Sequence, residues 1–208
     1  MMRVIAIDGP AGSGKSTVAR RVADELGWSF LDTGAMYRAV TVAAITENLD
    51  LSDHDAVGGF AERCEIEMTS AVTINGFDVN AAIRSQQANE GVSKVAALPR
   101  VRAAMVERQR RFAENQPFGT VVEGRDICTV VFPDAQVKIF LTASLEARAN
   151  RRPDEGGVSI QRRDEADSSR TASPLRQAND AKIIDTTYMT IDDVVREVIQ
   201  CLSQPPHA

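Results

Sequence analysis

The order of hydrophobic and polar residues in the first quarter of the chain predicts alternating strands and helices. Residues 3–8 form an apolar run that is rich in β-branched side chains and ends before Gly-Pro, as a buried parallel strand does. Residues 14–27 repeat hydrophobic side chains at helical spacing and end in a glycine. A second strand at 29–32 and a second helix at 35–49 follow. This alternation predicts a parallel sheet covered by helices.

The middle of the chain departs from this order. Residues 64–80 alternate apolar and polar side chains around an Asn-Gly pair, which is the signature of a β-hairpin. We expect a small antiparallel insertion with three strands here. The insertion as a whole is expected at about 51–97.

Five further elements complete the predicted core. A long helix has Pro99 near its start, where proline suits the first helical turn. Three apolar runs predict buried strands, which brings the parallel sheet to five strands, and a last helix closes the chain. These elements are expected at 98–116, 119–124, 136–142, 181–185 and 191–202.

A polar and charged stretch at 151–170 contains adjacent glycines and predicts a mobile loop or lid. We place the short lid itself at about 152–170. The fold class is therefore α/β, organised as a single domain over 1–208 whose core covers 1–50 and 98–208.

Composition excludes several classes of protein. The 208 residues are 43% hydrophobic and 25% charged, as in one globular domain. A net charge of −5 argues against bulk affinity for nucleic acid or anionic membranes, and no run approaches the ~20 apolar residues of a membrane span. Cys64, Cys128 and Cys201 have no paired spacing, which indicates free thiols in a reducing compartment. We expect a cytoplasmic protein without nucleic-acid or membrane partners.

One motif carries clear chemistry. Residues 9–16 (GPAGSGKS) fit the phosphate-loop pattern G-x-x-x-x-G-K-[ST] between a predicted strand and a predicted helix. Lys15 would reach the β- and γ-phosphate oxygens, and the Ser16 hydroxyl would be a Mg²⁺ ligand. A glycine-rich turn before a helix is the alternative, but it does not account for the Lys-Ser pair. We therefore predict an ATP site with a Mg²⁺ cofactor, formed by Gly9, Pro10, Ala11, Gly12, Ser13, Gly14, Lys15, Ser16 and Thr17.

A second group of residues suggests that the acceptor is also phosphorylated. The chain lacks the Asn-Lys-x-Asp of GTPases and the Asp-Glu strand end of larger ATPases. Four arginines follow predicted strands or lie in the predicted lid, where ligands bind in open α/β sheets. They are Arg38, Arg125, Arg163 and Arg170. Each alone is compatible with a solvated surface arginine, but their planar forks together suit phosphate. This combination predicts a small-molecule kinase.

Six stretches carry a resemblance to a known family: IDGPAGSGKSTVAR, LDTGAMYRAVT, SKVAALPRVR, EGRDICTVVFPDAQVKIFLTAS, RRDEADSSR with SPL just after, and AKIIDTT. Along nearly its whole length the chain resembles bacterial cytidylate kinases, in the nucleoside monophosphate kinase group of P-loop kinases. The resemblance implies a three-layer fold of the P-loop NTPase type with an acceptor-binding insertion. It also implies transfer of the ATP γ-phosphoryl to CMP or dCMP, giving CDP or dCDP and ADP. We expect a monomer whose partners are these nucleotides.

The resemblance also implies roles for single residues. Three would hold the acceptor phosphate: Thr33, Arg38 and Arg125. Three would read the cytosine edge: Ser93, Arg102 and Asp126. Three would close over the phosphate and ribose: Arg163, Asp167 and Arg170. The catalytic cations would be Lys15, Arg163 and Arg170. An acidic side chain such as Asp126 suits cytosine because it accepts from the N4 amine.

Alternatives remain at this point. Ser93 as a helix cap and Arg102 as a solvated side chain are the simpler interpretations of these two residues. Two alternative functions are also open: a P-loop kinase that acts on UMP, AMP or dTMP, which the residues around Asp126 would distinguish, and a regulatory protein that binds nucleotides without transferring phosphate. The chain also departs from the family's usual pattern: the lid is shorter, and Cys128 stands at a glycine position, where a left-handed backbone would strain it.

Overall fold

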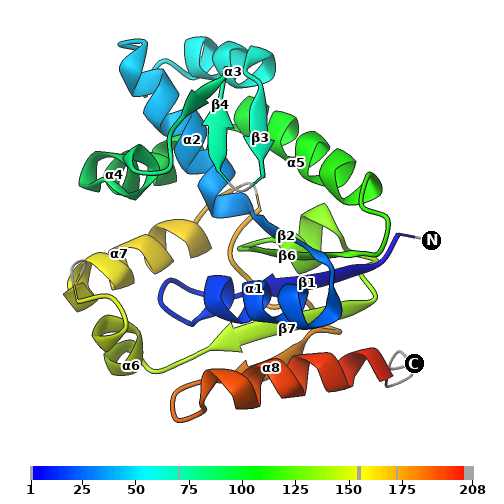
Figure 1. The fold of residues 1–208 in the computed structure, drawn as a ribbon. Helices are drawn as coiled ribbons and strands as arrows, with labels where there is room; N and C mark the ends of the chain where they lie inside the picture. Colours follow the sequence, from blue (N-terminus) through cyan, green and yellow to red (C-terminus); the bar gives the residue numbers. More distant parts are fainter. Residues whose placement is uncertain (1, 70, 154–155, 172, 204–208) are drawn as a thin grey trace. The chain divides into compact units, whose positions relative to one another are not determined.

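In a computed structural model the chain folds into two compact units (Figure 1). The core unit consists of 1–31 and 112–208, and the middle unit consists of 32–111. The structure describes residues 2–69, 71–153, 156–171 and 173–203.

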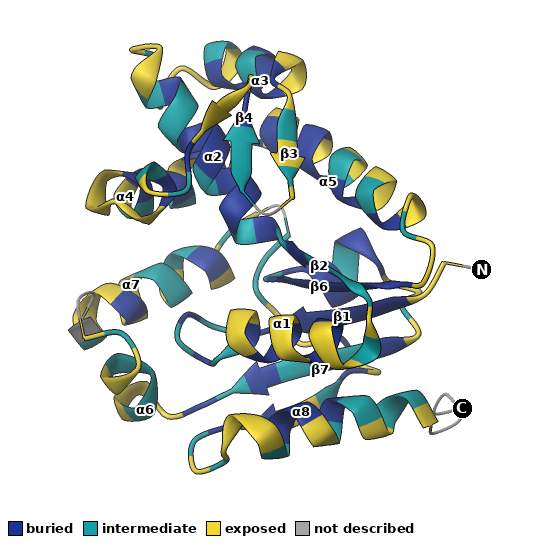
Figure 2. Ribbon diagram, in the orientation of Figure 1, coloured by how far each residue is buried: buried dark blue, intermediate teal, exposed yellow. Residues whose placement is uncertain are grey.

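A five-stranded parallel sheet forms the centre of the core unit, in the order β2-β6-β1-β7-β8. The strands are β1 (Val4–Asp8), β2 (Ser29–Asp32), β6 (Thr120–Gly124), β7 (Val137–Thr142) and β8 (Lys182–Asp185). β1 pairs with β6 from Val4 opposite Thr120, and with β7 from Ile5 opposite Val137. Both β1 and β6 are buried along their whole length (Figure 2), as the continuous apolar runs predicted. The predicted parallel sheet is confirmed.

The core unit contains the helices α1 (Lys15–Leu26), α6 (Leu145–Asn150), α7 (Gly156–Ser168) and α8 (Ile191–Gln200), with a π-helical turn η2 (Ile127–Val131) and a 3₁₀ turn η3 (Cys201–Ser203). Of these, the helices α1 and α8 pack against the sheet. Val18 and Val22 of α1 join Val194 of α8 and the sheet residues in one hydrophobic cluster. Trp28 packs half-buried against this cluster, and a Cβ at Gly119 would lie 2.6 Å from its indole ring.

The middle unit combines helices with a small antiparallel sheet in the order β3-β4-β5. Its elements are α2 (Thr33–Thr46), α3 (His54–Arg63), β3 (Ile66–Met68), β4 (Val72–Ile74), β5 (Phe77–Asp78), η1 (Ala82–Arg84), α4 (Gln86–Val95) and α5, which runs over Pro99–Glu114. Asn75 and Gly76 have φ values of 51° and 81°, as the two central residues of a type I′ hairpin turn require. The predicted three-stranded insertion is confirmed.

Two stretches differ from the sequence-based expectations. The middle unit is wider than the insertion expected at about 51–97, since α2 packs against α4 and β4. The expected loop at 151–170 contains a helix, α7, and the loop interpretation is wrong for those residues. Ile160, on α7, is fully buried, which gives this otherwise polar helix a packing anchor. None of the helices in the described part of the chain has the length and hydrophobicity needed to cross a bilayer.

Candidate active site

The backbone of the phosphate loop follows directly from the end of β1. Gly9, Gly12 and Gly14 have φ values of 151°, 75° and 93°, a range that side chains other than glycine rarely adopt. A Cβ at Gly9 would lie 2.1 Å from the Leu141 carbonyl oxygen, so only glycine fits there. Gly14 is the N-cap of α1 and no side chain accepts the helix's first N–H groups. This leaves a cradle of backbone donors suited to phosphate.

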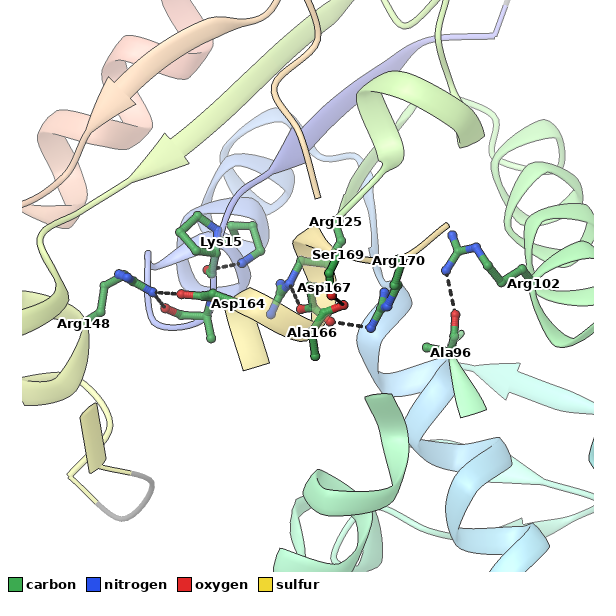
Figure 3. Close-up of polar contacts among 12 residues, drawn as sticks. Lys15, Ala96, Arg102, Arg125, Arg148, Asp164, Ala166, Asp167, Ser169 and Arg170 are labelled. Carbon is green, nitrogen blue, oxygen red and sulfur yellow. Dashed lines mark hydrogen bonds and ion pairs between the residues drawn. The ribbon is translucent and has the colours of Figure 1, made fainter. Parts of the chain in front are cut away.

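Lys15 is the cation of this loop. Its side chain is buried, and Nζ donates to the Pro10 carbonyl oxygen at 2.8 Å (Figure 3). Burial, followed by repulsion from Arg125, lowers the pKa of Lys15 to about 7. An anion placed in the loop would favour the protonated form of this side chain.

The Ser16 hydroxyl donates to Glu123 Oε1 at 2.7 Å. Glu123 is buried on β6, so the loop and the neighbouring strand bring a hydroxyl and a carboxylate together. Hard oxygen donors of this kind suit Mg²⁺, which keeps several waters and phosphate oxygens and needs only one or two protein ligands. Among the described residues no cluster of three His, Cys, Asp or Glu could hold a metal alone. The residues present therefore fit a Mg²⁺ ion that arrives with a nucleotide.

A pocket of about 370 Å³ opens beside the phosphate loop. Polar residues of the loop form one part of its wall, and Met189, Ile191 and Val194 form an apolar part near the start of α8. A polyphosphate site next to an apolar wall has the composition that a nucleotide needs. This wall was not predicted from the sequence, because short hydrophobic stretches before a helix have no motif of their own.

Arg151 and Thr186, which were also not predicted as site residues, contact the phosphate loop through hydrogen bonds. The Arg151 guanidinium donates to the Thr186 hydroxyl at 2.9 Å and to its carbonyl oxygen at 2.6 Å. The Thr186 hydroxyl in turn lies 3.1 Å from the Ser13 carbonyl oxygen. The segments after β7 and β8 therefore support the loop from one side.

Asp167 joins two of the predicted arginines (Figure 3). Arg125, just after β6, donates through Nε to Asp167 Oδ2 at 2.8 Å, and Arg170 pairs with Asp167 Oδ1. Asp167 is buried on α7; burial opposes its ionisation, but Arg125 and Arg170 outweigh it, and the net effect lowers its pKa. Arg163 lies half-buried on the same helix, whereas Arg170 lies beyond the end of α7 at Ser168. Arg163 and Arg170, seven residues apart, therefore do not lie on one face of a single helix.

Asp126 and Cys128 lie at the turn that follows β6. Asp126 is buried at the N-terminal end of η2. The next two backbone N–H groups, of Ile127 and Cys128, donate to the two carboxylate oxygens of Asp8 at 2.9 and 2.7 Å. Burial raises the pKa of Asp8 to about 6. The backbone at Cys128 is not left-handed, so a cysteine fits this glycine position of the family without strain.

Two of the three residues expected to bind an acceptor phosphate, Thr33 and Arg38, lie on α2 in the middle unit. Thr33 is buried as the first residue of that helix, and its N-cap Asp32 accepts from the Ala35 N–H at 2.8 Å. The other carboxylate oxygen of Asp32 pairs with the Arg38 guanidinium at 3.2 Å. Arg38 is therefore paired with a carboxylate and is not a freely solvated arginine.

Ser93 and Arg102 belong to the same unit. Arg102 is buried, donates to the Ala96 carbonyl oxygen at 3.1 Å and lies 5.5 Å from the centre of the Tyr37 ring. The interpretation of Arg102 as a solvated side chain is thus wrong. Ser93 is half-buried near the C-terminal end of α4, whose N-cap is Ser85, so it does not cap a helix. Tyr37, the aromatic partner of Arg102, was not singled out from the sequence.

The parallel sheet, the glycine-built loop and the Lys15–Ser16 pair define a P-loop nucleotide-binding fold. A sugar kinase structure from a Janibacter species shares the fold alone, with a TM-score of 0.51, 16% identity and coverage of 99% of this chain and 97% of that one. The family model described as cytidylate kinase matches residues 5–204.

Curated relatives agree with this match. A cytidylate kinase from Shouchella clausii is 46% identical, over 96% of each chain. A cytidylate kinase from Bacillus subtilis is 44% identical, also over 96% of each chain. The chain belongs to the cytidylate kinase family, and it is a nucleoside monophosphate kinase.

Proposed function

We propose that this protein transfers the γ-phosphoryl group of ATP to CMP or dCMP, giving ADP and CDP or dCDP. The observation that carries the proposal is the family match over residues 5–204, because a phosphate loop alone does not select an acceptor. The complete loop with Lys15 and Ser16 supports a chain that transfers phosphate over one that only binds nucleotides.

The donor would lie along the phosphate loop and the adjoining pocket. Backbone N–H groups of the loop bind phosphate oxygens, and Lys15 neutralises charge on the group being transferred. Ser16 and Glu123 would hold Mg²⁺, which when bound offsets charge on the β- and γ-phosphate oxygens. Met189, Ile191 and Val194 supply an apolar surface for the nucleoside.

The acceptor would use the residues that the family resemblance implies. Thr33, Arg38 and Arg125 bind its phosphate; Arg163, Asp167 and Arg170 close over the phosphate and ribose. Ser93, Arg102 and Asp126 read the cytosine edge. Burial of Arg102 and Asp126 supports such a role, because base-reading groups discriminate best when they are withdrawn from water. The lid assigned to 152–170 would act through α7.

The cellular setting is part of the same proposal. The three cysteines are free thiols, as a reducing compartment allows, and we propose a cytoplasmic monomer. Its partners would be small nucleotides.

An ADP-release assay across CMP, dCMP, UMP, AMP and dTMP tests the reaction, with chromatography identifying the product. We expect ADP release with CMP or dCMP and little without an acceptor. Release with UMP, AMP or dTMP at higher kcat/KM would point to a different monophosphate kinase. Nucleotide binding without ADP release for any acceptor would contradict phosphoryl transfer.

Asp126 offers a sharper test of the base. Asparagine at this position can both accept and donate, so Asp126→Asn should raise the UMP to CMP ratio of kcat/KM by about tenfold. Asp134→Asn, on the loop before β7, is the matched control and should leave the ratio unchanged. An unchanged ratio in Asp126→Asn would show that cytosine is read elsewhere.

A further inference from the structure

An ion pair outside the predicted site residues joins α7 to the phosphate loop. The Ala11 N–H donates to Asp164 Oδ1 at 3.0 Å, and Asp164 Oδ2 pairs with the Arg148 guanidinium. Arg148 also donates to the Ala11 carbonyl oxygen at 3.1 Å (Figure 3). Both polar groups of one residue in the loop are thus bound by one carboxylate and one guanidinium.

Arg148 is held in place by contacts that do not involve Asp164. Its Nε donates to the Ala143 carbonyl oxygen at 3.1 Å. A Cβ at Gly12 would lie 2.9 Å from the Arg148 Cβ, so α6 and the loop leave no spare room between them. Arg148 therefore has a fixed position next to the loop, and Asp164 docks onto it.

The environment of the pair makes it more than a surface contact. The side chains of Arg148 and Asp164 are only 12% and 17% exposed. Ion pairs in water are worth little, whereas hydrogen bonds to partly desolvated charges contribute substantially more. Asp164 also uses both oxygens, which asparagine cannot reproduce because its amide nitrogen would face the Arg148 donors.

Asp164 sits among the residues that α7 carries for catalysis. It follows Arg163 directly and precedes Asp167 by three residues, which is about one helical turn. We propose that Asp164 and Arg148 are a positioning pair that fixes α7 to the phosphate loop and so sets where Arg163, Asp167 and Arg170 lie relative to the donor phosphates. The inference rests on the proposed function of those three residues.

The pair should affect turnover more than donor binding. Without Asp164 the loop keeps its glycine-determined shape, and the Ala11 N–H that Asp164 releases can bond to water that enters the vacated space. We therefore expect Asp164→Ala to lower kcat by about 10–100-fold, while the Kd for ATP changes by less than about threefold. Asp164→Asn, which keeps one oxygen for Ala11, should lose about 3–10-fold in kcat.

The test compares Asp164→Ala, Asp164→Asn, Arg148→Ala and the double alanine variant, with Glu165→Ala as control. Glu165 is an exposed acid on the same helix, and its alanine variant should behave as wild type. The fold-decrease in kcat of the double variant should be no more than about twice that of the more impaired single variant, because the two residues act as one unit. The inference would be overturned if the fold-decreases in kcat of the two single variants multiply in the double variant, or if Asp164→Ala has a normal kcat. Equal losses of ATP affinity and kcat in Asp164→Ala would also overturn it.

Hydrogen exchange gives a readout that needs no turnover. Amides of α7 should exchange faster in Asp164→Ala than in the wild type, whereas those of α8 should not change. Unchanged exchange in α7 would also overturn the inference. Activity is measured with whichever acceptor the wild type uses, so failure of the wild type to use CMP or dCMP counts against the proposed substrate and not against the pair.

Discussion

Two helices of this protein have N-termini suited to an anion, and their first backbone N–H groups differ in whether a side chain already accepts from them. At the start of α1 the N-cap is Gly14, with a left-handed backbone and no side chain on the first N–H groups. At the start of α2 the N-cap is Asp32, whose carboxylate accepts from the Ala35 N–H and pairs with Arg38. One helix end is left open for a ligand, and the other is occupied by the protein's own anion.

The difference indicates two ways of binding phosphate. The open end of α1 offers fixed backbone donors that need no rearrangement when phosphate arrives. At α2 a phosphate must compete with Asp32 for the Arg38 guanidinium, so part of the new interaction replaces an existing one. The backbone-built site should therefore tolerate substitution poorly, and the side-chain site should show smaller and more graded effects.

The largest effect is expected from the backbone of the loop. Gly9→Ala would place a Cβ 2.1 Å from the Leu141 carbonyl oxygen, and we expect a loss of unfolding free energy of about 4 kcal/mol or more. Gly14→Ala is the matched variant, since its Cβ would meet nothing within 4 Å, and only its left-handed backbone costs about 1–2 kcal/mol. Urea unfolding of both variants measures the difference. Equal losses would mean that crowding at Gly9 is relieved elsewhere.

The second largest effect is expected from removing the positive charge of Lys15 in the phosphate loop. Lys15→Ala should lower kcat by about a hundredfold to a thousandfold, because a buried cation aimed at the transferred group is removed. Lys94→Ala, on the exposed face of α4, is the control. Steady-state kinetics on variants with native circular dichroism measures the effect. Retention of more than about a tenth of wild-type turnover would exclude a central role for Lys15.

Asp8, the last residue of β1 before the phosphate loop, should make the stability of the folded protein depend on pH. Its pKa is raised in the folded protein from 3.8 to about 6, so its contribution to stability is fully present below about pH 4 and is lost as pH rises through 6. The wild type should lose about 3 kcal/mol over this range relative to Asp8→Asn, whose side chain does not titrate. Urea unfolding of both proteins at pH 4 to 7 isolates this contribution. A constant difference between the two would show that the Asp8 pKa is not raised.

The smallest effects are expected at α2. Arg38→Ala should weaken CMP binding by about 2 kcal/mol and leave ATP binding unchanged, whereas Arg111→Ala, exposed on α5, should change neither. Asp32→Asn retains a helix cap but frees the Arg38 charge, so it should bind CMP at least as tightly as the wild type. Titration calorimetry of each variant with CMP and with ATP measures the two affinities. Equal weakening of CMP and ATP in Arg38→Ala would contradict the assignment of Arg38 to the acceptor.

The same contrast explains which parts of the fold and of the site could be predicted from the sequence. The phosphate loop is encoded in consecutive residues, so the motif by itself identifies Gly9, Lys15 and Ser16 as parts of one site. The parallel sheet followed from apolar runs, and the β4–β5 turn from Asn75-Gly76. Each of these features depends on local chemistry that a short motif records.

Features assembled from distant residues were not predictable in this way. Glu123 reaches Ser16 from a different strand, and Tyr37 meets Arg102 from another helix. No spacing in the sequence records such pairs. The extent of α7 did not follow from the sequence, because its polar residues and the adjacent glycines at its start favour a loop, while the buried Ile160 that packs it is a single apolar residue without a periodic pattern.

The packing of Trp28 on Gly119 has a practical consequence. Trp28 is the single tryptophan of the chain and belongs to the core unit. Its indole is half-buried against the hydrophobic cluster of α1, α8 and the sheet. Intrinsic tryptophan fluorescence is therefore a spectroscopic probe of the core unit alone, and its comparison with far-ultraviolet circular dichroism, which reports on helices of both units, would reveal whether the two melt together or one after the other.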